Sequence, residues 1–91
     1  MQFRISPHSA VSPPADALER LWQQLGPSRD ELTFALAGPE IRADTGEDEP
    51  VSMTRDERSE IGRRVILAVL GEVCEEAPEL QADWFAVSAE E

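Results

Sequence analysis

The chain has 91 residues, of which eight are Arg and nineteen are Asp or Glu, so its net charge at pH 7 is −11. The charge is uneven: residues 1–43 carry four Arg against five acids (−1), and residues 44–91 carry four Arg against fourteen acids (−10). Such a surface repels phosphate backbones and anionic lipids, which argues against nucleic acid and membranes and leaves a basic protein or a cationic ligand as the partner that charge favours.

An apolar fraction of 41 % is ordinary for a folded protein, and the length predicts one domain over residues 1–91. The first expected element is a strand at residues 2–6, because Phe3 and Ile5 alternate with polar neighbours and so share one face. Pro7 is expected to end this strand.

A first helix is expected to follow. Ser12 is a suitable N-cap, and Pro13 and Pro14 suit the first helical positions, where the N–H has no internal partner. Gly26 and Pro27 form a stop signal at the other end. The apolar side chains recur at spacings of three and four residues, which predicts one buried stripe: Leu18, Leu21, Trp22 and Leu25.

Residues 31–36 and 40–44 alternate again and predict two further strands. Their expected inward side chains are Leu32, Phe34, Leu36, Ile41 and Ala43. Two arrangements fit this pattern equally well. The two runs form a tight hairpin through residues 37–39, or they form one long bulged strand that ends near Asp44 and pairs with a return strand at residues 51–53.

The longest expected element is a helix that begins at Thr54. Thr54 and Glu57 have the spacing of a capping box, in which each side chain accepts a hydrogen bond from the other residue's backbone N–H. Pro78 cannot continue the hydrogen-bond ladder, so the helix ends just before it. Gly62 and Gly71 would let the helix approach a neighbour closely. The expected buried stripe is Ile61, Val65, Ile66, Val69, Leu70, Val73, Cys74 and Ala77.

Residues 83–88 alternate once more and predict a last strand, with Phe85 and Val87 facing the helices. The element order is therefore β-α-β-β-α-β, which predicts an α+β two-layer sandwich of the ferredoxin-like type. In this arrangement two helices cover one face of a four-stranded antiparallel sheet. Right-handed connections place the first and third strands at the centre.

The uncovered face of this sheet is the main candidate site. If the strands pair as expected, four outward side chains lie close together on it: Arg4, Arg42, Trp84 and Ala86. Trp and Arg are enriched at protein–protein interfaces, so we expect this face to bind a partner or a second copy of the chain. An RNA-binding sheet would instead present outward aromatic side chains on its two central strands, which carry none here.

A second candidate is an acidic patch at the end of the long helix: Glu72, Glu75, Glu76 and Glu79. Carboxylates at a helix C-terminus oppose the helix dipole. A patch in this unfavourable place is compatible either with a simple solvated surface or with a surface that a basic partner covers.

The tripeptide at residues 44–46, Asp-Thr-Gly, with Ile-Gly-Arg at residues 61–63, is similar to the two short signatures of retroviral aspartic proteases. Only fourteen residues separate the two motifs here, which leaves no room for the flap and the strands that lie between them in that family. We therefore expect Asp44 to form a turn. The acidic loop over residues 44–50 lacks the alternating ligands and central Gly of an EF-hand, so no metal is expected.

Cys74 is the only cysteine and belongs to the expected buried stripe, which predicts an inert thiol. His8 is the only histidine, so these two side chains offer no zinc site, and no cofactor is expected. The longest apolar run, residues 65–70, is too short to cross a bilayer, and the N-terminus lacks the pattern of a signal peptide. A cytoplasmic location is the simplest expectation.

These observations favour a small acidic protein-interaction or regulatory module without catalytic activity, and a homodimer. Two alternatives stay open at this point. One is a ligand-binding domain or enzyme with a pocket between sheet and helices, in which Arg4, Arg42 and His8 bind an anion or transfer protons. The other is an acidic mimic of nucleic acid that occupies a basic protein.

Overall fold

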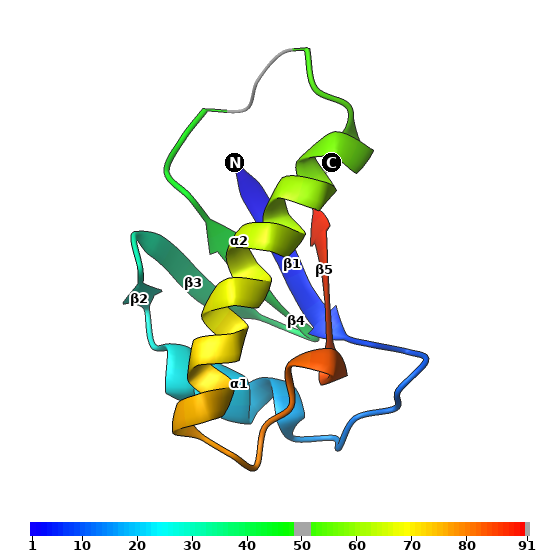
Figure 1. Ribbon diagram of the computed structural model, residues 1–91, viewed down its shortest axis with the longest axis vertical. Coiled ribbons are helices and arrows are strands. Elements are labelled where there is room, and N and C mark those ends of the chain that lie inside the picture. Colours follow the sequence, from blue (N-terminus) through cyan, green and yellow to red (C-terminus); the bar gives the residue numbers. More distant parts are fainter. Residues whose placement is uncertain (49–51, 91) are drawn as a thin grey trace.

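Two helices cover one face of a five-stranded antiparallel sheet in the computed structural model, which describes residues 1–48 and 52–90 (Figure 1). In chain order the elements are β1 (Gln2–Pro7), α1 (Ala17–Leu25), β2 (Ser28–Arg29), β3 (Leu32–Ala37), β4 (Glu40–Asp44), α2 (Arg55–Glu76), the 3-10 helix η1 (Ala82–Trp84) and β5 (Phe85–Ala89). The strands lie side by side in the order β2-β3-β4-β1-β5. Figure 1 shows α2 running across the front of the sheet, with α1 near its lower end.

The expectation of four strands was wrong, because the short strand β2 pairs with the start of β3. The turn between them consists of Asp30 and Glu31, with φ angles of 51° and 66°. This left-handed conformation is usual for Gly or Asn, so no familiar hairpin signal marks the turn. Two residues are also too few to show alternation. The sequence therefore offered no pattern from which β2 could be predicted.

The tight hairpin is the correct one of the two arrangements left open for β3 and β4. Ala37 pairs with Glu40, so only Gly38 and Pro39 form the turn. Gly38 has a φ of 64°, which disfavours any residue with a side chain. Of the alternative return strand at residues 51–53, the first residue lies outside the described part and the other two belong to no strand. As expected, β4 and β1 are neighbours inside the sheet.

Two elements begin two or more residues later than the sequence-based prediction, whereas the other boundaries agree to within a residue. α1 begins at Ala17, well after the expected N-cap Ser12, which has a φ of 52° and lies in the loop before the helix. Pro14 disfavours helical backbone at the residue before it, so the helix starts only beyond the two prolines. β5 begins at Phe85 rather than Asp83, because the residues before it form η1.

The core lies between the sheet and the helices, and alternate residues of each long strand point into it. Its largest fully buried side chains are Phe3, Ile5, Leu21, Ile41, Ile66, Leu70 and Val73. Two expected members are exposed instead, Val65 by 39 % and Leu36 by 42 %. Val65 is turned about 100° around the helix axis from buried Ile66, so it falls on the flank of α2. Leu36 lies on β3 beyond the part that β2 pairs with, at the edge of the sheet.

α2 lies very close to the sheet at one of its glycines. Its start is fixed by the expected capping box, in which Thr54 and Glu57 exchange hydrogen bonds of 3.2 and 3.3 Å. At Gly62 a Cβ would lie 2.4 Å from Cδ1 of Phe3, whereas a Cβ at Gly71 would meet no atom within 4 Å. The prediction of a close approach is thus confirmed for the first glycine and wrong for the second.

The first turns of α2 are also hydrogen-bonded to the end of β5. The Oγ of Ser59, which is 6 % exposed, accepts the backbone N–H of Ala89 at 2.9 Å. Nε of Arg55 donates to the carbonyl of Ala89 at 3.3 Å. Because β5 is an edge strand, side chains of α2 take the place that a neighbouring strand would have here. None of the helices in the described residues is long and apolar enough to span a membrane.

We expect Gly62→Ala to lower the free energy of unfolding by about 1–3 kcal/mol, because the added methyl overlaps the buried ring of Phe3. Gly71→Ala should raise it by up to about 1 kcal/mol, since Ala is the better helix former and the methyl has open space. Urea unfolding of both variants measures the difference. Equal effects of the two substitutions would contradict the close contact at Gly62.

We expect Ser59→Ala to lower the free energy of unfolding by about 1–3 kcal/mol, because it leaves the backbone N–H of Ala89 buried without its acceptor. Amide hydrogen exchange at Ala89 should accelerate in this variant. Ser9→Ala in an exposed turn is the control and should change stability by less than about 0.5 kcal/mol. Unchanged exchange at Ala89 would show that the hydrogen bond contributes nothing.

Candidate functional site

The face of the sheet opposite the helices is not covered by any element of the described chain, and many of its side chains are small. Alternate residues of β1, β3, β4 and β5 point to this side, and the strand register places them next to one another. Six of them have small side chains: Ser6, Thr33, Ala35, Ala37, Ala86 and Ser88. We call this surface the open sheet face. Another protein surface can approach such a floor closely.

The centre of the open sheet face carries an ion-pair network. Arg4 and Arg42 lie directly opposite each other on β1 and β4, where two like charges would repel. Glu40 lies between them, with carboxylate oxygens 3.7 Å from Nε of Arg4 and 3.8 Å from Nε of Arg42. Glu90 adds a contact of 3.4 Å to Arg42. With Asp44, this face carries two Arg against three acids, a net charge of −1 on a chain of −11.

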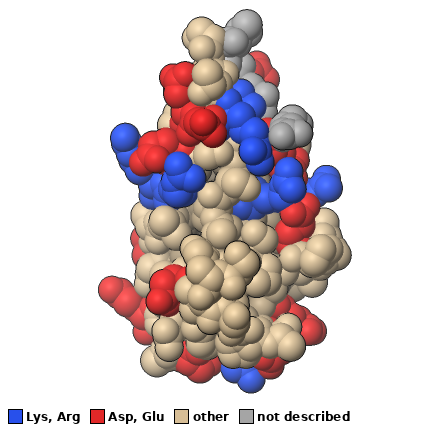
Figure 2. Space-filling model, turned by 90° about the vertical axis from the view of Figure 1, so that its right-hand side faces the viewer, with Lys and Arg blue, Asp and Glu red and all other residues tan. Residues whose placement is uncertain are grey.

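The side of the molecule that includes β5 shows the same mixing of charges. Figure 2 faces this side, and in its upper half the Arg side chains are interleaved with acids, while the lower half is largely uncharged. On this side, positive charge is therefore found next to negative charge rather than as a basic patch.

The structure brings together three of the four side chains predicted for this face. Arg4 and Arg42 are opposite each other, and Ala86 lies opposite Ser6 one step along β1. Trp84 ends η1 instead of lying in the last strand, and its half-buried side chain packs against the core. Beside Arg42 the face has a shallow hollow of about 330 Å³, whose lining includes Gln2, Thr33, Ala35 and Asp44. The acids that pair with the two Arg were not predicted, because pairing depends on strand register.

The acidic patch predicted on α2 is divided by the fold. Glu76 makes two hydrogen bonds with the guanidinium of Arg29, one of them 3.2 Å long, and Glu72 lies 3.9 Å from the same group. Among the described residues, Glu75 and Glu79 are exposed and form no ion pair with Arg29. Arg29 belongs to β2, so its approach to α2 could not be predicted without that strand.

Glu72 and Glu76 have opposite pKa shifts. A hydrogen bond with Asp30, together with the charge of that carboxylate, raises the pKa of Glu72 above its usual value. The hydrogen bond from Arg29, and then its charge, lower the pKa of Glu76. The turn between β2 and β3 therefore brings one acid against α2 as well as one cation.

We expect Glu72→Gln to raise the melting temperature at neutral pH, and Glu76→Gln to lower it. The stability linked to Glu72 is present below the usual carboxyl pKa and is lost as the pH rises through its raised folded-state pKa. The stability linked to Glu76 is present above the usual carboxyl pKa and is lost as the pH falls through its lowered pKa. Thermal unfolding at neutral pH and at about pH 3 should show both differences shrinking in acid. Shifts of the same sign in both variants would contradict these assignments.

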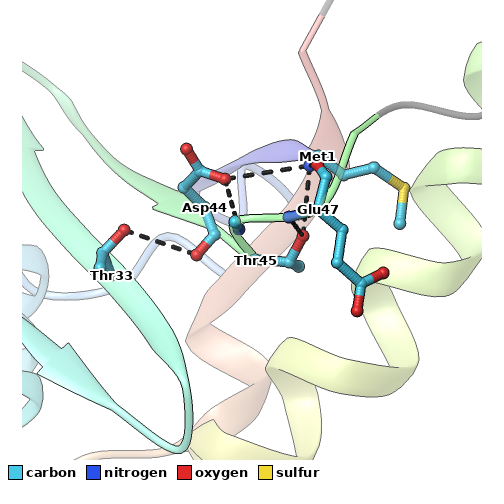
Figure 3. Close-up of polar contacts among 6 residues, drawn as sticks. Met1, Thr33, Asp44, Thr45 and Glu47 are labelled. Atoms are coloured by element: carbon cyan, nitrogen blue, oxygen red, sulfur yellow. Dashed lines mark hydrogen bonds and ion pairs between the residues drawn. The ribbon is translucent and has the colours of Figure 1, made fainter.

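The chain bends sharply after β4, and this bend holds the N-terminal amino group (Figure 3). Oδ1 of Asp44 accepts the N–H of Gly46 at 2.8 Å, which confirms the expected turn. The ammonium of Met1 donates to Oγ1 of Thr45 at 3.2 Å and to the carbonyl of Glu47, and it lies 3.9 Å from Oδ1 of Asp44. In Figure 3 the carboxylate of Glu47 points away from this ammonium, on the side of α2.

The remaining candidate side chains lie apart from one another. Cys74 is half-buried, and burial, followed by the charge of Asp83, raises the pKa of its thiol. His8 is exposed in the loop after β1, where its Nδ1 accepts the N–H of Ala10 at 3.3 Å. Among residues 1–48 and 52–90, no group of three or more His, Cys, Asp or Glu side chains is placed to hold a metal ion.

Comparison of the chain with protein-family models, with curated proteins and with solved structures finds no match.

Proposed function

We propose that this chain is a protein-interaction module that forms a homodimer by packing its open sheet face against the same face of a second copy. The observation that supports this most directly is the charge balance of that face. Two copies of a chain with a net charge of −11 repel each other, and the repulsion is weakest where the local charge is near zero. The open sheet face, at −1, is such a place.

The composition of the face also supports close packing of two sheets. Sheets that pack face to face lie about 10 Å apart, and small floor side chains permit this approach. In a two-fold symmetric contact, Arg4 and Arg42 of one copy can meet Glu40 and Glu90 of the other. These groups already form ion pairs within each copy, so fewer unpaired charges lose water when the faces meet.

We infer further that the chain is a ferredoxin-like sandwich with an added edge hairpin. Without β2, the elements follow the β-α-β-β-α-β order, and the remaining strands lie in the order β3-β4-β1-β5. This arrangement leaves one sheet face free of helices by construction, which makes that face available for assembly.

The positions of Arg4 and Arg42 favour this function over a ligand pocket between sheet and helices. Both side chains lie on the open sheet face, on the opposite side of the sheet from α1 and α2. The space between α2 and the sheet is occupied by fully buried side chains, including those of Ile41, Ile66 and Leu70. Anion-binding Arg side chains are therefore not available to a pocket in that space.

We expect Ala35→Glu to weaken self-association by at least about tenfold, because it places a large side chain on the floor of the contact and adds a negative charge to the face. Ala68→Glu, on the exposed side of α2, changes the net charge equally and is the matched control. Sedimentation equilibrium over a range of protein concentrations gives the dissociation constants, and melting curves show that both variants fold. A wild-type chain that is monomeric at high micromolar concentration, or equal effects of the two substitutions, would overturn the proposal.

A further inference from the structure

A second concave surface lies on the helix side of the molecule, between α2 and the turn that joins β2 to β3. It is a groove of about 180 Å³. Its apolar lining comes from Met1, Leu32, Ile61 and Val65. Val65 is 39 % exposed there, although Val is a side chain that folding normally buries. The groove is thus an apolar surface that residues 1–48 and 52–90 leave uncovered.

The rim of this groove is acidic. Asp30 and Glu31 border it from the β2–β3 turn, and Glu47 borders it from the bend after β4. Figure 3 shows the Glu47 carboxylate turned toward the α2 side, away from the ammonium of Met1. These acids come from two segments that are well separated in the sequence.

Three of the cations near the groove make contacts of their own. Arg29 binds Glu76 and lies near Glu72, and the Met1 ammonium is held by the bend after β4. Arg58, one turn before Ile61 on α2, donates from Nη1 to the carbonyl of Met53 at 3.0 Å. The raised pKa of Glu72 beside Asp30 indicates that negative charge is in excess at this end of the groove.

We propose that this groove binds a basic segment of a partner protein by taking up one Arg or Lys side chain of that segment. The aliphatic part of the side chain lies against Ile61 and Val65, and its cationic head meets the carboxylates of Asp30, Glu31 and Glu47. Long basic side chains combine an apolar stem with a charged head in this way. Arg fits best, because its planar guanidinium can bind two carboxylates at once.

The volume of the groove suits a single amino-acid side chain better than a free organic ligand. Pockets for small organic ligands usually enclose about 300–1,000 Å³, which is larger than this groove. Charge selects the sign of the occupant, since a net charge of −11 attracts basic proteins and repels a second copy of the chain. This surface is separate from the open sheet face, so the proposal stands whether or not the chain dimerises.

The test uses the full chain and a short capped peptide of Gly and Ser with one central Arg, and NMR of the protein detects binding. A second peptide carries citrulline, a neutral isostere, in place of the Arg. We expect the Arg peptide to shift the resonances of Leu32, Ile61 and Val65, and the citrulline peptide to bind at least about fivefold more weakly. Equal binding of the two peptides would overturn the proposal.

Matched variants separate the groove from general attraction to an acidic chain. Val65→Ser and Glu31→Gln should each lower the affinity of the protein for the Arg peptide by about five- to tenfold. Two control variants should change this affinity by less than about twofold. Leu67→Ser alters a side chain with the same 39 % exposure on the other flank of α2, and Glu75→Gln makes the same change of charge. Equal losses in all four variants would show diffuse attraction only. A loss of self-association in Val65→Ser would make the groove a contact between copies, which also overturns the proposal.

Discussion

The close contact between Gly62 of α2 and the ring of Phe3 on β1 is the constraint on which the rest of the structure depends. A residue with a Cβ at this position would hold the helix away from the sheet. The contact brings Ile66, Leu70 and Val73 onto the inner side chains of the strands, where they are fully buried. It also sets the rotation of α2 about its axis, which decides that Val65 is exposed on one flank. Both proposed surfaces follow from this seating, because the helices occupy one face of the sheet only.

The net charge of the chain affects the two proposed surfaces, the open sheet face and the groove beside α2, in opposite ways. The proposed self-association must overcome repulsion between two copies, and the open sheet face lowers this repulsion by pairing Arg4 and Arg42 with neighbouring acids. Association with a basic partner is assisted by the same net charge, so the groove can leave its carboxylates with few cations nearby. The faces lie on opposite sides of the sheet. A dimer formed through one of them therefore leaves the other accessible, and the chain could bridge two copies of a basic partner.

Hydrophobic periodicity predicted most of the fold because it reflects local geometry. Strands β1, β3 and β4, the body of α1, the capping box at Thr54 and the end of α2 before Pro78 were all expected from residues close in sequence. Strand β2 was not, since two residues with a left-handed turn carry no periodic signal. Part of the candidate site was predicted in the same local way. Arg4, Arg42 and Ala86 follow from strand alternation, whereas the position of Trp84 depended on a boundary that η1 moved.

The sequence alone determined the sign and the uneven distribution of charge, the kinds of elements and which side of each strand is apolar, because these properties belong to single residues and their near neighbours. Only the tertiary structure decided which charges meet. Glu40 and Glu90 reach the Arg side chains of β1 and β4 through strand register, and Arg29 reaches Glu76 across 47 residues of chain. The same holds for the groove, whose apolar and acidic parts come from the chain start, a turn, a bend and a helix. Contacts between segments that are far apart in the sequence depend on how the helices pack against the sheet. The local sequence pattern of each element does not determine this packing.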